Sequence, residues 1–403
     1  MLKTVKFTNF KSLSPEIITL GNFNVLIGAN AAGKSNFIDG LKFIRDVNNT
    51  GLYNAVGNRL GWENTLTRGL NPRQPIAMEF KYDFSSTPIQ FRIGGKRYNL
   101  FKAEHMVEFS NTGRRLFINK EEFTSSACHN EREFNESYDR TGSKVKIHSP
   151  IVYGKEKTAP QNKIPSQFQA DLFLEQSFFS VTSNIVADQI DMWRFYHLDV
   201  QAARRSCTDT GQDFLQPDGG NLALVLSKMS KSSNQRIRSI HNRILSLMST
   251  LVTQFSKWRP ERLIDGSITF SIYEEGISKP LLPAMISDGT IRLLSMLVSL
   301  LYQPARSSMI CIDEPERYLH PQVLEPLIEI MREVSTKTAI IITTHSPDLV
   351  RLLKPQEVLL VDKKNNVTHL VNAASKEMID KFLDEFTLDE LWLSGYLKGG
   401  KVF

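Results

Sequence analysis

The sequence has few of the features that mark secreted, zinc-binding or membrane proteins. It contains three cysteines, Cys128, Cys207 and Cys311, and no CxxC pair, which argues against a disulfide framework or a zinc site. No apolar run reaches the roughly 18 residues that a membrane span needs, and Met1–Ile18 lacks the apolar core of a signal peptide. We therefore expect a protein of the reducing cytoplasm with no membrane partner.

The charge balance is mildly basic. Lys and Arg number 49 against 43 Asp and Glu, which gives a net charge of +6 and a pI of about 9.0. Nucleic acid fits such a chain as a partner, and so does a solvated surface with no ligand, because no dense run of Lys or Arg occurs. The 403 residues are 41% hydrophobic, enough for a large core or two unequal lobes.

The first part of the chain alternates between short apolar and turn-forming segments. Thr4–Asn9 and Asn22–Ile27 are predicted to be strands, and the second leads through a glycine-bounded turn into a helical pattern at Asn36–Asp46. Ile76–Phe117 contains several alternating segments separated by Ser, Pro and Gly, which indicates an antiparallel meander.

The middle of the chain shows weaker patterns. Glu121–Ser149 is polar with little periodicity, which predicts a long loop or a weakly ordered insertion. Helical apolar spacing follows in Leu172–Met192 and Ile237–Phe255, but neither sustains the heptads of an extended coiled coil.

From Leu281 the pattern returns to alternating helices and strands. The expected order is a helix at Thr290–Tyr302, a strand at Met309–Ile312, a helix at Pro321–Val334, a strand at Ala339–Thr343, a further helix, a hairpin around Asp362–Asn366 and a final helix.

One segment has the pattern of a phosphate-binding loop. Gly28-Ala-Asn-Ala-Ala-Gly33-Lys34-Ser35 follows an apolar strand and precedes a helix, so its backbone N–H groups can surround phosphates. Lys34 is expected to reach the β- and γ-phosphates and the Ser35 hydroxyl to ligate Mg²⁺. The other interpretation, a glycine-rich turn without a ligand, is disfavoured by the correct flanking elements. The predicted nucleotide contacts are Asn30, Ala31, Ala32, Gly33, Lys34, Ser35 and Asn36.

A second segment supplies acidic groups. The apolar strand Met309–Ile312 ends in Asp313 and Glu314; the first acid is suited to the Mg²⁺ shell and the second to polarising the attacking water. An apolar run that ends in two acids is common, and the hypothesis depends on the phosphate-binding loop.

Two further polar groups belong to the same hypothesis. His345 follows the next strand, where a neutral imidazole could bond the γ-phosphate or the water, although a lone His at a strand end is more often a polar cap. Ser287-Asp288-Gly289-Thr290 stands at a helix start, where a small residue and a glycine allow an anion to approach. An N-cap and turn explains these four residues equally well.

The order of these motifs resembles that of the ABC-type ATPases. Ser287 stands 26 residues before Asp313, and His345 stands 32 residues after it, as the signature serine and the switch histidine do in that class. The resemblance implies ATP and Mg²⁺ as ligands and a head-to-head dimer, in which Ser287, Asp288 and Gly289 of one subunit close over the γ-phosphate bound by the other.

The resemblance narrows to the RecF, SMC and OLD-like group, which includes short heads of the AAA family from DNA maintenance and anti-phage defence. Asp313-Glu-Pro-Glu-Arg-Tyr-Leu-His320-Pro321 resembles the OLD-like sequence, and Phe7-Thr-Asn-Phe-Lys11-Ser12 resembles the opening of RecF and SMC proteins, where the basic residue approaches the nucleotide. The segments Phe195-Tyr196, Pro217–Leu222 and Glu390–Gly395 are also similar to that group.

The chain also departs from the family pattern. The signature lacks its second glycine, and Asp288 places an acid beside the expected γ-phosphate position. His320 stands where transporters carry an aspartate. The Mg²⁺-sensing glutamine is not identified; Gln74 is a candidate, and a surface polar residue is the alternative.

The resemblance implies an α/β fold of the ABC-type P-loop ATPase head, with a mixed central sheet, an antiparallel β subdomain, a mainly helical insertion and no long coiled coil. We expect an N-terminal ATPase lobe at 1–120, a variable loop and helical insertion at 121–265, and a C-terminal ATPase lobe at 266–403.

The expected function is a slow ATPase that depends on a partner or on assembly, with Lys34, Glu314 and His345 as catalytic residues and Ser35 and Asp313 at Mg²⁺. We expect a homodimer or a higher oligomer that regulates an effector. The 58 residues after His345 are too few for the nuclease domain that OLD proteins carry there, so a nuclease or toxin effector should be a separate polypeptide. The alternatives are a RecF-like clamp that binds DNA, a transporter motor subunit, and a scaffold without ATPase activity.

Overall fold

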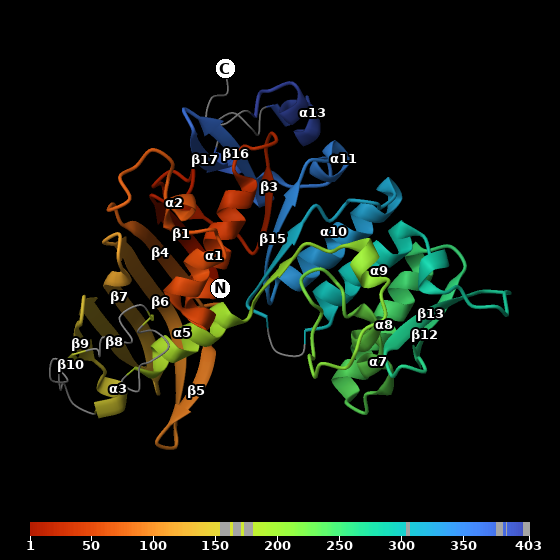
Figure 1. Cartoon of the computed structure of the whole chain (residues 1–403), viewed down its shortest axis with the longest axis horizontal. Coiled ribbons are helices and arrows are strands. Elements are labelled where there is room, and N and C mark those ends of the chain that lie inside the picture. The colour runs from red at the N-terminus through yellow and green to blue at the C-terminus, as the bar shows by residue number, and fades with distance from the viewer. Residues whose placement is uncertain are drawn as a thin grey trace. The chain divides into compact units, whose positions relative to one another are not determined.

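The computed structural model describes residues 1–153, 162–163, 171–172, 180–303, 307–375, 382–383 and 385–397. The chain folds as two compact units (Figure 1). Unit 1 comprises Met1–Trp193, Pro355–Phe386 and Ser394–Phe403, and unit 2 comprises Arg194–Lys354 and Thr387–Leu393.

Unit 1 contains a large antiparallel sheet. Its strands lie in the order β10-β9-β8-β7-β6-β4-β1-β2, with β5 paired to β6. The strands are β1 (Leu2–Thr8), β2 (Ile18–Thr19), β4 (Ile76–Asp83), β5 (Ile89–Ile93), β6 (Lys96–Asn111), β7 (Leu116–His129), β8 (Arg132–Thr141), β9 (Lys144–His148) and β10 (Asn162–Lys163). The meander predicted at Ile76–Phe117 is therefore confirmed.

The segment Glu121–Ser149 is not a loop, as the sequence suggested, but belongs to strands β7, β8 and β9. Alternate side chains do turn into the unit, yet several of these are charged or polar: Glu121, Glu136 and Arg140 are at most 1% exposed. Glu121 bonds Tyr138 and Arg140. Inward-facing positions of these strands are thus occupied by polar side chains that bond one another, where apolar side chains are usual. The alternation of apolar and polar residues that marks a strand is therefore absent from the sequence.

A second group of strands in unit 1 carries the glycine-rich loop. β3 (Phe23–Ile27) pairs in parallel with β16 (Val358–Lys364), and β16 forms a hairpin with β17 (Val367–Asn372). The turn residues Asn365 and Asn366 both have positive φ, which Asn tolerates better than most residues.

Helix α1 (Lys34–Gly57) joins the two groups of strands in unit 1. Its Phe37 and Phe43 lie in a cluster of buried aromatic rings with Phe7 and Phe10 of the N-terminal segment and Phe109 of β6. Fixing these rings in the core sets the position of the first turn of α1, where the phosphate-binding loop ends. The other helices of unit 1 are α2 (Trp62–Thr65), α3 (Pro150–Tyr153) and α5 (Val181–Asp191), with short turns η3 (Pro355–Glu357) and η4 (Ala373–Ser375).

Unit 2 has a three-stranded group in the order β11-β14-β15. β14 (Met309–Asp313) and β15 (Ala339–Thr344) are parallel, with Asp313 opposite Thr343. β11 is Trp193–Tyr196 and begins at the boundary between the units. The helices are α6 (Val200–Ala203), α7 (Leu222–Lys231), α8 (Gln235–Leu251), α9 (Asp288–Leu301), α10 (Pro321–Ser335), α11 (Pro347–Val350) and α13 (Leu388–Leu393), with the short turn η2 (Pro283–Met285).

The helix expected at Ile237–Phe255 ends earlier than predicted, at Leu251. Phe255 begins β12 (Phe255–Arg262), which pairs with β13 (Ile268–Glu274) in a hairpin. The buried ring of Trp258, on β12, packs against His241 of α8. The apolar spacing thus continued from α8 into β12, because both elements have apolar residues that pack on each other, and the predicted helix included the start of the strand.

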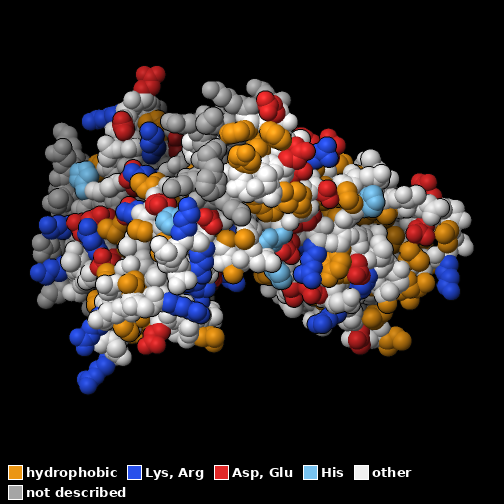
Figure 2. Space-filling model, turned by 90° about the horizontal axis from the view of Figure 1, so that it is seen from above, with side chains coloured by type: hydrophobic (Ala, Val, Ile, Leu, Met, Phe, Trp, Pro, Cys, Tyr) orange, Lys and Arg blue, Asp and Glu red, His pale blue; other side chains and the backbone are white. Residues whose placement is uncertain are grey.

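The helix predicted at Asn36–Asp46 is longer than expected, since α1 continues to Gly57; the remaining predicted helices agree with the described residues. α5, α9, α10 and α13 lie where helices were predicted, within a few residues; the segment 173–179 of the predicted helix Leu172–Met192 lies outside them. Helix α1 is interrupted by a kink at Gly51, whose φ of 79° is not helical, and none of the described helices is long and apolar enough to cross a membrane. Basic and acidic side chains are interspersed over the face drawn in Figure 2.

Candidate nucleotide site

The phosphate-binding loop of unit 1 has the backbone geometry that its glycines predict. Gly33, just before α1, has φ of 115°, and a Cβ there would lie 2.2 Å from Thr368 Oγ1. A Cβ on Gly28 would lie 2.2 Å from the carbonyl oxygen of Val361 in β16. Any larger residue at either position would therefore move the loop away from the hairpin β16–β17.

Lys34 is held inside the loop. Its side chain is buried, and Nζ donates hydrogen bonds to the carbonyl oxygens of Gly28 at 2.8 Å and Ala29 at 3.1 Å. This position keeps the ammonium group where a phosphate cradled by the loop would lie. Ser35, next in the chain, is exposed, so its hydroxyl is accessible to a metal ion.

A set of residues far apart in the sequence supports the loop from behind. The hydroxyl of Thr368, which is fully buried in β17, donates to the carbonyl oxygen of Ala32 at 2.8 Å. Ser12 Oγ lies 2.7 Å from Thr368 Oγ1, and Asn36 Nδ2 donates to Ser12 Oγ at 2.7 Å. The sequence predicted Asn36 as a nucleotide contact, and in the structure its side-chain amide braces the loop. Ser12 stands in the opening segment that resembles RecF and SMC proteins, but no role of its own was predicted for it. Thr368 was missed, since it stands in no motif that points to the loop.

Lys11 forms an ion pair with a residue of α1. Its Nζ lies 2.8 Å from Asp39, which also pairs with Arg59 at 2.8 Å. Burial alone would raise the pKa of Asp39, but the bonds from Arg59 and Lys11 outweigh it and hold that pKa below its usual value. The nucleotide contact expected for Lys11 stays a prediction, because the observed partner of its ammonium group is Asp39.

The residues of the loop fit a nucleoside triphosphate. The N-terminus of α1, which has no acidic residue in its first turn, attracts negative charge. Asn30 and Ala31 are exposed beside it, while Ala32 is buried. Hydroxyl and carboxylate oxygens of the kind that Ser35 and Asp313 offer are the ligands that Mg²⁺ prefers.

Unit 2 carries the predicted acids at the carboxyl end of β14. The Asp313 carboxylate accepts a hydrogen bond from the Thr343 hydroxyl of β15 and lies 3.1 Å from His197 Nδ1. His197 was not identified from the sequence. It is 75% exposed at its side chain, so a cation at Asp313 could displace it at little cost.

Glu314 has an unusual backbone conformation. Its φ is 44°, in the left-handed region that costs a non-glycine residue about 1–3 kcal/mol. Its N–H donates to Thr343 O at 3.1 Å, and its carbonyl oxygen accepts from Arg292 Nη2 at 2.7 Å. These two bonds hold the predicted general base in the strained conformation.

Arg292 connects the helix that follows the signature sequence with the two acids. It belongs to α9, is only 2% exposed, and donates also to the carbonyl oxygens of Asp313 at 3.2 Å and of Leu198. Burial lowers its pKa, while the carboxylates of Glu316, Asp313 and Glu314 oppose that change. The sequence did not single out Arg292, although its place one turn into the signature helix was a usable signal.

His345 lies at the end of β15, as predicted. Its backbone N–H donates to Glu316 Oε1 at 3.3 Å, and the hydroxyl of Thr344 donates to the same oxygen at 2.7 Å. The structure thus brings Asp313, Glu314 and His345 to the adjacent carboxyl ends of two parallel strands within unit 2.

The signature sequence begins α9, and its serine is the N-cap. Ser287 Oγ accepts a hydrogen bond from the N–H of Thr290 at 3.1 Å. The N-cap was one of the two interpretations of this segment, and anion binding was the other. Asp288 pairs with Arg204 at 2.7 Å, and Arg204 also donates to the carbonyl oxygen of Pro283 at 3.0 Å. The positive charge of Arg204 therefore neutralises Asp288, the acidic residue by which this signature sequence differs from the family pattern. A Cβ on Gly289 would lie 2.9 Å from the carbonyl oxygen of Tyr318, so glycine is required there.

His320 and Gln74, which the sequence also pointed to, lie at a helix N-terminus and on the surface. His320 is the N-cap of α10, where Nδ1 accepts the N–H of Gln322 at 3.3 Å. Gln74 is exposed in the segment before β4, and its role as a metal sensor stays a prediction.

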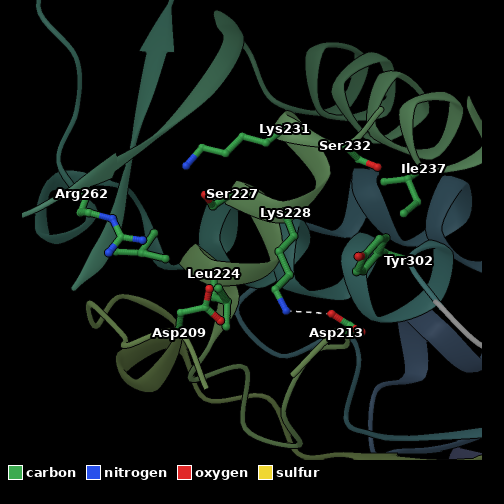
Figure 3. A pocket seen from close by; sticks show the side chains of 11 residues that line it. Asp209, Asp213, Leu224, Ser227, Lys228, Lys231, Ser232, Ile237, Arg262 and Tyr302 are labelled. Carbon is green, nitrogen blue, oxygen red and sulfur yellow. Dashed lines mark hydrogen bonds and ion pairs between the residues drawn. The ribbon is translucent and has the colours of Figure 1, made fainter. Parts of the chain in front are cut away.

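A pocket of about 440 Å³ in unit 2 is separate from the predicted site residues (Figure 3). It is lined by residues of α7, α8, β12 and the segment 209–213, together with Tyr302. Its Lys228 is neutralised by Asp213 at 2.7 Å, and both acidic and basic groups line it, so its charge favours no ligand class.

Comparison with known proteins agrees with this geometry. The chain is similar in structure to an SMC head bound to the C-terminal winged-helix domain of ScpA, with TM-score 0.55, 12% identity, and 92% of this chain and 97% of that chain covered. It is also similar to the SMC head domain with an extended coiled coil from Pyrococcus furiosus, bound to the C-terminal domain of ScpA, with TM-score 0.52, 11% identity, and 95% and 99% covered. No curated protein matches the chain.

These likenesses show that the chain has the fold of an SMC-type ATPase head, as its sequence predicted. The family described as "AAA domain, putative AbiEii toxin, Type IV TA system" matches residues 23–351, a range that includes the phosphate-binding loop, the acids and His345. The chain therefore belongs to this family of AAA domains.

Proposed function

We propose that the chain binds ATP with Mg²⁺ and hydrolyses it slowly. Two copies of the chain dimerise around ATP, so that the nucleotide acts as a conformational switch. The observation that carries this proposal is the complete phosphate-binding loop at the N-terminus of α1, with the Lys34 ammonium held inside it.

Each residue has a part that its chemistry supports. Lys34 and the backbone N–H groups of the loop bind the phosphates, and Ser35 and Asp313 would hold Mg²⁺, which neutralises charge on the transferred phosphoryl group. Glu314 orients and polarises the attacking water, and His345 contacts the γ-phosphate or that water. Positioning and electrostatics supply most of the catalysis in such reactions.

Dimerisation completes the proposed site. Ser287 and Gly289 stand at the N-terminus of the 14-residue helix α9, which is suited to receive a phosphate from a second copy. The ion pair of Asp288 with Arg204 reduces the repulsion that this carboxylate would exert on a phosphate. ATP binding would then control assembly, and hydrolysis would release it.

We further propose that this switch regulates a separate effector, a nuclease or a toxin, in defence against phage. The family description names a putative toxin of a toxin–antitoxin system, and two similar SMC heads are bound to parts of another protein, ScpA. Purification of the tagged chain from its native host should recover an effector polypeptide, and more of it with ATP than without. Strong, salt-sensitive binding of DNA by the purified chain would instead support the RecF-like alternative.

The enzymatic proposal is tested by phosphate release from wild type, Lys34→Ala and Glu314→Gln. Lys34→Ala should weaken ATP binding by about tenfold or more because the phosphates lose a buried cation. Glu314→Gln should keep ATP binding and slow hydrolysis by about 100-fold. Lys42→Ala, an exposed lysine of the same helix, is the matched control. Hydrolysis at wild-type rate in Glu314→Gln would refute the assignment of the base, and normal ATP affinity in Lys34→Ala would refute the site.

A further inference from the structure

In unit 2, the turns that follow β14 and β15 are connected by hydrogen bonds beyond the ends of these strands. The turn after β14 contains Glu314 and Glu316, while β15 ends at Thr344 and the turn after it begins at His345. The bond from Glu314 N–H to Thr343 O extends the strand pairing by one residue. After this point the described backbone–backbone bonds between the two turns cease, and the remaining connection is made by a side chain.

Glu316 provides that connection. Its Oε1 accepts the Thr344 hydroxyl at 2.7 Å and the His345 N–H at 3.3 Å. Thr344 is fully buried, and its Oγ1 in turn accepts the N–H of Ser346 at 3.0 Å. One carboxylate oxygen on the turn after β14 thus determines the path of the backbone through His345.

The environment of Glu316 makes this arrangement energetically costly. Its Oε2 is buried and has no hydrogen-bond partner among the described residues. Burial raises the pKa of the Glu316 carboxyl, and the bond from Thr344 only partly opposes this. A buried polar atom without a partner destabilises the folded state. A residue needed only to fill the space would avoid that cost, which indicates that the acceptor at Oε1 has a use of its own.

We propose that Glu316 is a positioning residue for ATP hydrolysis, because its carboxylate fixes the backbone of His345 relative to the turn that carries Glu314. This inference rests on the proposed function. Glu316 need not contact the nucleotide; its effect passes through His345, whose imidazole must keep its place beside the γ-phosphate or the attacking water. A displacement of about 1 Å at such a group is enough to slow an enzyme strongly.

The first test compares kinetic constants of Glu316→Ala, Glu316→Gln and the control Glu325→Ala, which removes an exposed carboxylate on α10. Glu316→Ala should lower kcat by about tenfold or more with KM for ATP nearly unchanged, because ground-state binding is not affected. Glu316→Gln should recover most of the rate, since its amide oxygen can still accept both hydrogen bonds. The control should behave as wild type. A normal kcat in Glu316→Ala, or no recovery in Glu316→Gln, would overturn the proposal.

A double-mutant cycle separates positioning of His345 from a general structural effect. In a His345→Ala background, Glu316→Ala should have no further effect on kcat, because the group that it positions is gone. An equal loss of rate in both backgrounds would show that Glu316 acts independently of His345, which contradicts the proposal.

Amide hydrogen exchange gives a measure that does not require hydrolysis. In Glu316→Ala, a peptide that covers 343–349 should exchange faster than in wild type, since the His345 N–H loses its acceptor. Unchanged exchange overturns the proposal even if the wild type proves to have no ATPase activity. If wild type does not hydrolyse ATP but the peptide exchanges faster, the proposed function fails and the structural link from Glu316 to His345 stands.

Discussion

Arg292 shows how one side chain can control the geometry of another. Its planar guanidinium bonds the backbone carbonyls of Leu198, Asp313 and Glu314 from inside unit 2. Glu314 has a positive φ, so its backbone would relax toward a commoner conformation if the Arg292 bond were lost. The base thus depends on a residue that need not touch the nucleotide.

Replacing Arg292 by Lys is therefore expected to slow hydrolysis much more than it weakens ATP binding. An ammonium group cannot reproduce the forked geometry that reaches several carbonyls at once, so kcat should fall by about 10-fold or more with little change in KM. Steady-state phosphate release measures both constants. Arg317→Lys, an exposed arginine of the turn after β14, serves as the control; equal kinetics in the two variants would contradict the role of Arg292.

At the scale of elements, the phosphate-binding loop depends on the hairpin β16–β17 that closes behind it. Thr368 of β17 donates to Ala32 in the loop, and its methyl and hydroxyl groups fill the space beside Gly33. The sequence separation is large, but the parallel pairing of β3 with β16 brings the hairpin beside the loop.

Thr368→Val tests this support, because it keeps the shape of the side chain and removes the hydroxyl. The carbonyl of Ala32 and the hydroxyl of Ser12 lose a partner, which should lower the free energy of unfolding by about 1–3 kcal/mol. ATP affinity should fall as well, since the loop is less well ordered. Urea unfolding and nucleotide titration measure the two effects. Thr368→Ser, which keeps the hydroxyl, should retain affinity; if it binds ATP as weakly as Thr368→Val, the hydrogen bond is not the cause.

The elements that carry the site were predictable because local rules decide them. A strand, a glycine-bounded turn and a helix start give the loop at Gly28–Ser35 from sequence alone, and an apolar run that ends in acids gives β14 with Asp313. Strands β7 to β9 were not predictable from apolar periodicity, because Glu121, Glu136 and Arg140 occupy inward positions where apolar residues are expected. Their partners lie on neighbouring strands.

The supporting residues of the site were hidden for a related reason. Arg292, Glu316 and Thr368 each act through two or three hydrogen bonds to backbone groups or hydroxyls of segments that are separated from them in sequence. Such bonds depend on tertiary structure. The sequence offered only the place of Arg292 in the signature helix and of Glu316 in the motif after Asp313, and neither place reveals the bonds.

At the scale of the whole molecule, the proposed switch depends on a second copy of the chain. The signature helix α9 is proposed to receive the γ-phosphate that the other copy binds. A ligand that needs groups from two copies stabilises the assembled state through its differential affinity for that state. ATP binding and assembly should therefore be linked reciprocally.

This linkage predicts ATP-dependent dimerisation of the Glu314→Gln variant, in which slow hydrolysis preserves the bound nucleotide. Light scattering after size exclusion should give the mass of a dimer with ATP and Mg²⁺ and of a monomer without them. Adding Ser287→Glu should abolish the dimer, because a carboxylate at the start of α9 would face the γ-phosphate of the partner copy with like charge. Adding Ser233→Glu, which places the same charge at an exposed serine between α7 and α8, should leave it intact. A Glu314→Gln, Ser287→Glu protein that still dimerises with ATP would show that α9 does not meet the nucleotide of a second copy.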